Sequence, residues 1–388
     1  MSRFHSYLNT SASLVGAYTG DQPLHLYLKQ YFSQNKKHGS RDRRLIATCC
    51  YSYFRMGHAL KELDIRDRMR AGLFLCHDAP GEWAVLFEED WLDRWKGDIE
   101  GRMNFLGDKY PSFSSADIFP WADAISTGID REAFIRSHLV RPDVFLRIRP
   151  GNKESVEGSL KSAGVAFCRL TESCLSVASE TRLDTVVKLD KEAVIQDYSS
   201  QRMADFFPEG AKTVWDCCAA SGGKSILAVD ALPGIELTVS DVRPAILQNL
   251  AKRFRAAGIA RYRPVVRDLA GEEAPPEKNI AMFDLVICDA PCSGSGTWAR
   301  NPEQLYYFTK EKMEHYAALQ QRITQHAVSC VAGGGYFLYI TCSVLKAENE
   351  AIVSQLMDRF PLECIRSGSV TGYEHRADTM YAALLRKK

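Results

Sequence analysis

The sequence lacks several features that mark common classes of protein. None of its apolar runs approaches the roughly 20 residues that a membrane-spanning helix needs, and residues 1–5 do not begin a signal peptide. No Cys-x-x-Cys or His-Glu-x-x-His occurs, so the spacing predicts no metal site. The 12 cysteines among 388 residues follow no framework spacing, which is typical of a reducing compartment. We therefore expect a globular cytoplasmic protein without a membrane segment or a metal.

Two nucleotide-binding motifs are also missing. Gly223-Lys224-Ser225 imitates the end of a phosphate-binding P-loop, but Cys218 stands where that loop requires its first glycine. The dinucleotide-binding pattern Gly-x-Gly-x-x-Gly does not occur either. A Gly-rich turn at 218–225 nevertheless lets the backbone approach a ligand at a helix N-terminus.

Neither sign of charge is in excess, since the net charge is only +1, but the charged residues are unevenly distributed along the sequence. Between residues 29 and 70 eleven Lys or Arg stand against four acids, whereas residues 78–132 are acidic. The basic stretch alternates apolar helix positions with a polar break at 36–44, in which Ser40 or Asp42 is expected to cap the next helix. Such charges fit either a solvated helix face or a nucleic-acid-binding module.

With 46% hydrophobic residues, the chain can bury a large core and is long enough for two or three domains. Residues 1–140 read as a helical domain and residues 141–195 as a small α/β module. That module is expected to contain a strand at 144–149 and a helix at 154–163. From 196 to 388 strands and helices alternate, which predicts a doubly wound, Rossmann-like α/β domain. The strands are expected at 213–217, 236–240, 263–266, 283–288 and 335–341, with helices from Gly222, over 243–257 and through Gln320.

Two cysteines follow predicted strands at the point where each strand ends. The run 284–288 leads into Asp289 and Cys292, and Cys342 follows the strand 336–341. Because ligands bind at the carboxyl edge of an open parallel sheet, these side chains are candidates for a reactive site. A free cysteine is more often a small buried hydrophobe, and we interpret Cys288, inside the strand, in that way.

Two further carboxylates follow the second and third strands of the sheet. Asp241 and Asp268 could accept hydrogen bonds from ribose hydroxyls and an adenine amino group, or they could simply cap surface helices. Together with the Gly-rich turn, they favour a nucleoside ligand without a phosphate tail, such as S-adenosylmethionine.

The third part of the chain resembles the catalytic domain of the RsmB/Sun family of RNA 5-methylcytosine methyltransferases. The matching motifs are Cys218-Ala219-Ala220-Ser221-Gly222-Gly223-Lys224, Asp289-Ala290-Pro291-Cys292-Ser293-Gly294, Arg300-Asn301-Pro302-Glu303, and Thr341-Cys342-Ser343 followed by Glu348-Asn349-Glu350. The resemblance extends to Gln196-Asp197 and Leu146-Arg147, and faintly to residues 39–44, which resemble the family's NusB-like region. This chain departs from the family at Ser221, where the family has proline, and at Thr379-Met380-Tyr381, where it has Gly-Phe-Phe.

The resemblance implies a role for each matched residue. Cys342 is the expected nucleophile, Cys292 assists release of the product, and Asp289 holds or protonates the cytosine ring nitrogen. The expected residues of the S-adenosylmethionine site are Cys218, Ala219, Ala220, Ser221, Gly222, Gly223, Lys224, Asp241, Arg243, Asp268 and Asp289. Arg41, Arg43 and Arg44 of the NusB-like region are expected to contact RNA.

The function implied is methyl transfer from S-adenosylmethionine to carbon 5 of a cytosine in RNA, through a covalent cysteine adduct. Ribosomal RNA is the expected partner, transfer RNA is the alternative, and the enzyme is expected to be a monomer. Two other classes stay open from the sequence. A DNA 5-cytosine methyltransferase uses the Pro-Cys cysteine as its nucleophile, and a non-catalytic RNA-binding assembly factor would need neither thiol.

Overall fold

The computed structural model describes residues 2–271 and 282–388, and the chain divides into two compact units. The helical unit comprises Met1–Asp123, Asp130–Arg141 and Thr297–Thr309. The α/β unit comprises Ala124–Ile129, Pro142–Gly296 and Lys310–Lys388. The segment predicted as a separate small module therefore groups with the Rossmann-like region, and residues 297–309 group with the N-terminal helices.

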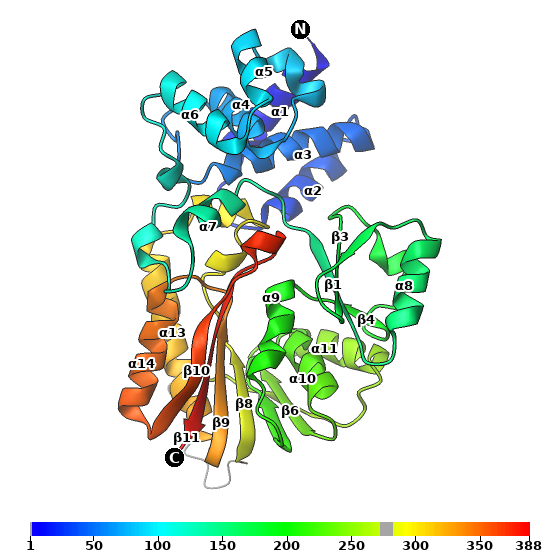
Figure 1. Cartoon of the computed structure of the whole chain (residues 1–388), viewed down its shortest axis with the longest axis vertical. Helices are drawn as coiled ribbons and strands as arrows, with labels where there is room; N and C mark the ends of the chain where they lie inside the picture. The colour runs from blue at the N-terminus through cyan, green and yellow to red at the C-terminus, as the bar shows by residue number, and fades with distance from the viewer. Residues whose placement is uncertain (1, 272–281) are drawn as a thin grey trace. The chain divides into compact units, whose positions relative to one another are not determined.

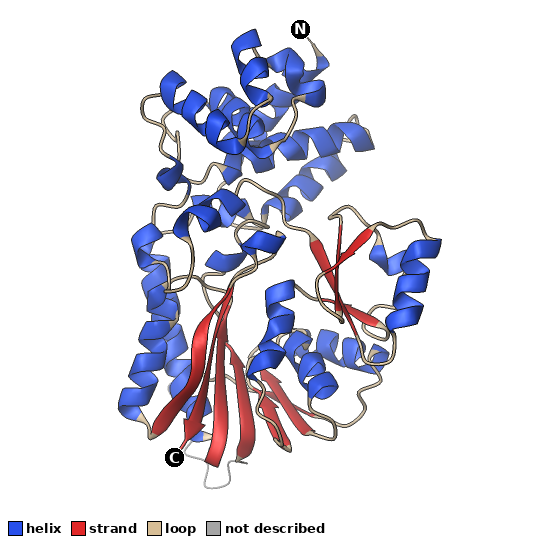
Figure 2. Ribbon diagram, in the orientation of Figure 1, coloured by secondary structure: helices blue, strands red, loops and turns tan. Residues whose placement is uncertain are grey.

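The helical unit consists mainly of helices, drawn in blue in Figure 2. They pack around one apolar core that includes Leu24, Ile46 and Phe54. Asp64, Asp98 and Asp130 cap three of its helices by accepting backbone N–H bonds that a helix start leaves open. The helices are α1 (Arg3–Ala17), α2 (Leu24–Gln34), α3 (Ser40–Arg55), α4 (Ile65–Cys76), α5 (Glu89–Trp95), α6 (Ile99–Lys109), α7 (Arg131–Ser137) and α12 (Pro302–Tyr306).

The start of α3 differs from the simple side-chain cap expected from the sequence. Gly39 is the residue before the helix, and Asp42 reaches back to accept the Gly39 N–H at 3.0 Å. Asp42 also accepts hydrogen bonds from Arg3 at 2.8 Å and from the Tyr7 hydroxyl at 2.5 Å. This carboxylate therefore joins α3 to α1, and Ser40 is the first helical residue.

Within the α/β unit, the described residues form a small antiparallel sheet in the order β2-β3-β1-β4. Its strands are β1 (Val144–Ile148), β2 (Phe167–Arg169), β3 (Cys174–Val177) and β4 (Ala193–Ile195). One face of this sheet is covered by α8 (Lys153–Ser162), as Figure 1 shows. Leu146, Val156 and Leu160 are buried between the sheet and this helix. The alternation at 144–149 thus corresponds to a strand with one face on its own small core.

The larger sheet of the described chain has the order β10-β11-β9-β8-β5-β6-β7. Strands β5 to β9 run parallel, while β11 is antiparallel to both β9 and β10. The strands are β5 (Thr213–Asp216), β6 (Glu236–Asp241), β7 (Arg263–Val266), β8 (Phe283–Asp289), β9 (Val331–Thr341), β10 (Leu362–Val370) and β11 (Met380–Lys387). This is the expected Rossmann-like sheet, extended by the pair β10 and β11, of which β10 had no sequence prediction.

Helices cover both faces of this sheet and bury two apolar cores. On one face α10 (Gly223–Ala231) and α11 (Pro244–Ala256) pack through residues such as Ile226 and Phe254. On the other face α13 (Lys310–Ser329) and α14 (Glu350–Arg359) pack through Val328 and Ile352. The short helix α9 (Tyr198–Gln201) links the small sheet to β5. In the part of the chain that the structure describes, no helix has the length and apolarity needed to cross a membrane.

Candidate functional site

The two strand-end cysteines meet at the carboxyl edge of the sheet. Strands β8 and β9 are parallel neighbours with Asp289 opposite Ile340, so the loops that follow them leave side by side. Their side chains bring the Cys292 and Cys342 sulfur atoms to 3.3 Å from each other. The hydrogen bond to Cys342, together with burial, raises the pKa of the Cys292 thiol well above its usual value. Cys292 therefore favours the protonated thiol form.

A buried carboxylate holds the two cysteine loops together. Glu348 accepts hydrogen bonds from the Ser293 backbone N–H at 2.7 Å and from the Ser343 hydroxyl at 2.9 Å, each the residue after a thiol. Gln320 of α13 donates to the same carboxylate at 3.1 Å. Burial raises the pKa of Glu348, although these hydrogen bonds oppose the rise. The geometry of the thiol pair therefore depends on a residue of the motif 348–350 to which the sequence analysis gave no role.

Glycine is required where the two loops touch. The Gly296 N–H donates to the Cys342 carbonyl at 2.9 Å, and the Thr379 N–H donates to the Gly296 carbonyl at 3.0 Å. A Cβ at Gly296 would lie 1.8 Å from the Thr379 carbonyl oxygen, so no side chain fits. The residues 379–381 that depart from the family motif thus form a close backbone contact with this loop and lead into β11.

Asp289, the third expected catalytic residue, is paired with Lys224 at the end of β8. Lys224 Nζ donates to Asp289 Oδ2 at 3.0 Å and to Ser200 Oγ at 2.8 Å. The lysine is only 8% exposed, whereas the Asp289 side chain remains 31% exposed. The carboxylate is therefore held from one side by a cation and stays open on the other side. Ser200 is a further residue that the sequence analysis missed.

The Gly-rich turn after β5 has the backbone shape of a ligand loop. Ala220 has φ of 45° and Gly222 has φ of 85°, and a Cβ at Gly222 would meet Phe254 at 2.7 Å. Ser221, which replaces the family's proline, accepts a side-chain hydrogen bond from Arg253 at 3.0 Å. Arg253 is itself paired with Asp190 at 2.7 Å, so this side-chain contact holds the turn where proline is absent.

Comparison with known proteins places these motifs in a family. Residues 204–382 match the family described as 16S rRNA methyltransferase RsmB/F. This region of the chain resembles the RsmB/F methyltransferase family. The match contains the Gly-rich turn, Asp289 and both site cysteines, and the α/β unit extends beyond it at both ends.

Curated relatives of the RsmB/F family extend the match over more of the chain. Ribosomal RNA small subunit methyltransferase B of Xanthomonas campestris pv. campestris is 30% identical over 58% of this chain and 53% of its own length. Probable ribosomal RNA small subunit methyltransferase B of Bacillus subtilis is 27% identical over 62% of this chain and 55% of its own length. The chain thus spans about half the length of these relatives.

Solved structures agree with the RsmB/F assignment at the level of the fold. The crystal structure of PH0851 covers 100% of this chain with a TM-score of 0.72 and 21% identity, and this chain covers 99% of it. NSun6 from Pyrococcus horikoshii, solved with SFG, covers 66% of this chain with a TM-score of 0.57 and 14% identity, and this chain covers 94% of it. At these identities the likeness establishes the methyltransferase fold.

The carboxylates after β6 and β7 have partners of their own in this RsmB/F-type sheet. Asp241 accepts hydrogen bonds from the Ala220 N–H at 3.1 Å and from Arg243 Nε at 3.0 Å. Burial raises the pKa of Asp241, but the bonds from Arg243 and Ala220 outweigh it and lower the pKa overall. Asp268 is exposed and accepts the Ala270 N–H at 2.8 Å, as a local turn cap does. The ligand role of both carboxylates stays a prediction.

Asp216, at the end of β5, is a buried carboxyl group next to the turn. It is fully buried, and the Ser225 hydroxyl donates to one of its oxygens at 2.6 Å. Within residues 2–271 and 282–388, no hydrogen-bond partner lies near its other oxygen, Oδ1. Burial raises the pKa of Asp216 to about 7. In its protonated form the Asp216 carboxyl group offers an O–H donor and places no charge in the buried site.

Three other sulfur atoms converge beneath the turn. The thiols of Cys217, Cys218 and Cys288 lie within 4.8 Å of one another, the one such group found among the described residues. Cys217 and Cys288 belong to the apolar core under β5 and β8, where burial raises the pKa of the Cys217 thiol. Three sulfurs leave the fourth position of a tetrahedral zinc site unfilled, so their packing role is the simpler interpretation.

The three arginines expected to contact RNA lie on the first turns of α3, in the helical unit. Arg41, Arg43 and Arg44 are all exposed. Arg41 pairs with Glu82, and Arg43 donates to the His38 carbonyl at 2.8 Å. The motif residue Glu303 lies in the same unit and accepts the Leu24 N–H at 3.1 Å, which joins α12 to α2.

Proposed function

We propose that this chain is an S-adenosylmethionine-dependent RNA methyltransferase that modifies carbon 5 of a cytosine through a covalent cysteine adduct. The observation that carries the proposal is the pair of sulfur atoms of Cys292 and Cys342, 3.3 Å apart, at the same sheet edge as Asp289. Two thiols serve a reaction in which a bond to the base is first made and later broken. We further propose a cytoplasmic, monomeric enzyme that acts without a metal.

The turn after β5 fits the methyl donor. A Cβ on Gly223 would meet nothing within 4 Å, so the N-terminus of α10 opens onto free space that a ligand can occupy. Bound there, S-adenosylmethionine supplies a methyl group on a positively charged sulfur. The residues proposed to hold it are Cys218, Ala219, Ala220, Ser221, Gly222, Gly223, Lys224, Asp241, Arg243, Asp268 and Asp289.

Cytosine carbon 5 is too weak a nucleophile to take a methyl group unaided, and the thiol chemistry overcomes this. The Cys342 thiolate adds to carbon 6 and forms a C–S bond, which gives carbon 5 the reactivity of an enamine. Asp289 holds or protonates the ring nitrogen, so negative charge does not build up there. After methylation the proton on carbon 5 passes to solvent, and the electron pair it leaves re-forms the double bond between carbons 5 and 6. The C–S bond breaks, Cys342 departs as a thiolate, and the ring nitrogen gives up any proton it received from Asp289.

The electrostatics of the pair support this order of roles. Because the raised pKa of Cys292 favours its protonated form, Cys292 can donate its S–H to the Cys342 sulfur and is itself the less suitable nucleophile. Cys292 remains as a protonated group beside the reacting sulfur. We therefore propose that Cys342 attacks and that Cys292 assists release.

The substrate proposed is ribosomal RNA, by analogy with the names of the relatives. The exposed Arg41, Arg43 and Arg44 would contact phosphates and position the RNA without reading bases. The competing proposals are methylation of transfer RNA, methylation of DNA, and a non-catalytic role as an RNA-binding assembly factor.

Bisulfite sequencing of total RNA from cells with and without the gene tests the proposal. We expect one protected cytosine in ribosomal RNA that is lost with the gene and restored by the purified chain on deproteinised RNA. A protected site in transfer RNA would replace the substrate class. Unchanged RNA in cells, with no methyl transfer by the purified chain to RNA or DNA, would leave only the assembly role.

Asp241→Ala is expected to weaken S-adenosylmethionine binding by roughly 1–3 kcal/mol, because buried polar partners lose their acceptor. Calorimetry on the full chain measures this affinity directly. Asp284→Ala is the matched control, since Asp284 accepts the Lys212 and Thr213 N–H groups, both at 2.9 Å, at the opposite end of β8. Equal affinities for wild type and Asp241→Ala would refute the assignment of Asp241.

Joint replacement of Arg41, Arg43 and Arg44 by Ala is expected to weaken RNA binding and to flatten its dependence on salt. Each lost phosphate contact lowers the slope of log K against log salt by about 0.7–0.9, so three contacts amount to about 2. Replacing Arg94 and Lys96, exposed cations on and just after the acidic helix α5, is the control and should leave the slope unchanged. If the triple variant keeps the wild-type slope, these arginines form only a solvated face.

A further inference from the structure

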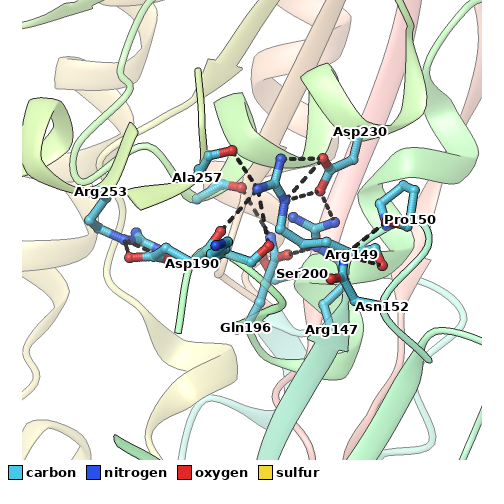
Figure 3. A network of polar contacts seen from close by, with 12 residues as sticks. Arg147, Arg149, Pro150, Asn152, Asp190, Gln196, Ser200, Asp230, Arg253 and Ala257 are labelled. Atoms are coloured by element: carbon cyan, nitrogen blue, oxygen red, sulfur yellow. Dashed lines mark hydrogen bonds and ion pairs between the residues drawn. The ribbon is translucent and has the colours of Figure 1, made fainter. Parts of the chain in front are cut away.

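A chain of hydrogen bonds runs from the small sheet to the proposed catalytic carboxylate. It begins at Arg147 on β1, which is 4% exposed and donates through Nη1 to Asp230 Oδ2 at 2.6 Å (Figure 3). Arg147 Nε donates to Gln196 Oε1 at 2.7 Å. Gln196 is 7% exposed and follows β4, so both residues belong to the small sheet and its exit.

The direction of this chain is fixed by chemistry. A guanidinium can only donate, so the Gln196 atom facing Arg147 must be the amide oxygen. The Gln196 amide nitrogen then points the other way, to Ser200 Oγ at 3.2 Å and to the Gly223 carbonyl at 3.4 Å. Ser200 Oγ also receives Lys224 Nζ, and Lys224 donates onward to Asp289. Each contact along the path from Arg147 to Asp289 therefore pairs a donor with an acceptor, and the Ser200 hydroxyl oxygen accepts from both Gln196 and Lys224.

We propose that Arg147 and Gln196 are positioning residues for the methyl transfer reaction, acting through Ser200 on Lys224 and Asp289. The inference rests on the proposed function, and it gives the small sheet a part in catalysis. Lysine has a long side chain with many rotamers, and two acceptors fix this ammonium group in one place. A shift of about 1 Å in a catalytic group can lower a rate about 100-fold, so the anchor of Ser200 matters for kcat.

Arg149 is a matched control that distinguishes a purely structural role of Arg147 from a positioning role, because both arginines pair with Asp230. Arg149 pairs with the other Asp230 oxygen through Nη2 at 2.8 Å and donates to the Ala257 carbonyl at 2.6 Å. Among the described residues, the side-chain hydrogen bonds of Arg149 go to Asp230 and to the carbonyls of residues 190, 191 and 257, and none goes to Gln196. If only the contacts with Asp230 matter, replacing either arginine should change activity to the same extent. If the path to Lys224 matters, only the replacement of Arg147 should lower activity.

A double-mutant cycle tests the path on the full chain with RNA substrate. Arg147→Lys and Gln196→Met are each expected to lower kcat at least about tenfold, with KM for RNA and the methyl donor within about twofold. The double variant should be no slower than Gln196→Met, because both changes break one path. Arg149→Lys should keep kcat within about twofold of wild type. Additive losses, or equal losses in the two arginine variants, would overturn the inference.

A second measurement reads the position of Lys224 without any RNA. Amine-directed labelling followed by mass spectrometry should find Lys224 protected in wild type and Arg149→Lys, and labelled several-fold faster in Gln196→Met and Arg147→Lys. Labelling that is equal in all four proteins contradicts the positioning role, even if the variants differ in activity. A wild-type chain that is inactive on RNA but shows the expected labelling would instead remove the proposed function and keep the path to Lys224.

Discussion

Cys342→Ala is expected to abolish methyl transfer and to leave no covalent complex with RNA. Without the thiolate nothing adds to carbon 6, so carbon 5 never acquires enamine character. The loss should bring the rate below detection, because the adduct is the first step of the reaction. Incubation with RNA and S-adenosylmethionine, followed by a denaturing gel and a methyl transfer assay, measures both outcomes.

Cys292→Ala is expected to behave differently, although its sulfur lies only 3.3 Å from that of Cys342. Addition and methylation proceed, and the reaction stalls before the C–S bond breaks. An RNA–protein adduct that survives denaturing conditions should therefore accumulate, as intermediates do when a later step is removed. The adduct should be absent from the double variant, which lacks the nucleophile.

Two controls make the thiol experiment decisive. Cys168→Ala removes an exposed thiol of the small sheet and should leave activity and adduct level unchanged. Thermal unfolding of each variant establishes that the active-site loops remain folded. A stable adduct that forms only in Cys342→Ala would reverse the two roles, in the pattern of DNA 5-cytosine methyltransferases. If neither single variant forms an adduct, the release role of Cys292 is wrong.

The predicted catalytic residues could be found from the sequence because each one follows a short apolar strand. Asp289, Cys292 and Cys342 needed only the rule that parallel strands present their carboxyl ends at one edge. The closeness of the thiols was not predictable, since it requires β8 and β9 to be neighbours in the sheet order, and strand order is a long-range property. The sequence also lacked a signal for β10, whose residues are mostly exposed or half-buried and do not alternate.

The supporting residues could not be predicted from local pattern. Gln196 and Glu348 are polar residues in irregular segments, where surface exposure is the usual expectation. In the structure they are 7% and 0% exposed, because each satisfies donors from segments far away in the sequence. For Arg147 the sequence indicates a half-buried strand and a resemblance to the family, but no role. Its partners, Asp230 and Gln196, lie 83 and 49 residues further along the chain. The motif Glu348-Asn349-Glu350 was a signal for the family, but it gave no role to any of the three residues.

Glu348→Ala is expected to lower both stability and activity by large amounts. The substitution removes the acceptor of the Ser293 N–H and of one Gln320 amide N–H in a buried site, at about 1–3 kcal/mol for each group, while Gln320 keeps its bond to the Pro291 carbonyl. It also frees the two loops that hold Cys292 and Cys342, so kcat should fall about 100-fold if the sulfur atoms move by about 1 Å. Chemical denaturation and steady-state kinetics on the same preparations separate the two effects.

Glu348→Gln is the matched variant, because it keeps an acceptor where two donors converge. Its amide oxygen can accept from Ser293 and Gln320, and its amide nitrogen can donate to the Ser343 hydroxyl, which is able to rotate. Activity should therefore stay within about tenfold of wild type. Equal losses in the Ala and Gln variants would mean that the charge, rather than the hydrogen-bond geometry, supports the thiol pair.

The dependence of stability on pH distinguishes these explanations further. The pKa of Glu348 is raised in the folded chain, so between the unfolded value of about 4.3 and the folded value the native state binds the proton that the unfolded state has released. The stabilisation is complete below about pH 4 and is lost as pH rises through the folded pKa. Glu348→Gln cannot titrate, so its free energy of unfolding should fall less steeply with pH than that of wild type. Parallel pH curves for the two proteins would contradict a raised pKa at Glu348, and with it burial as the dominant influence on this carboxyl group.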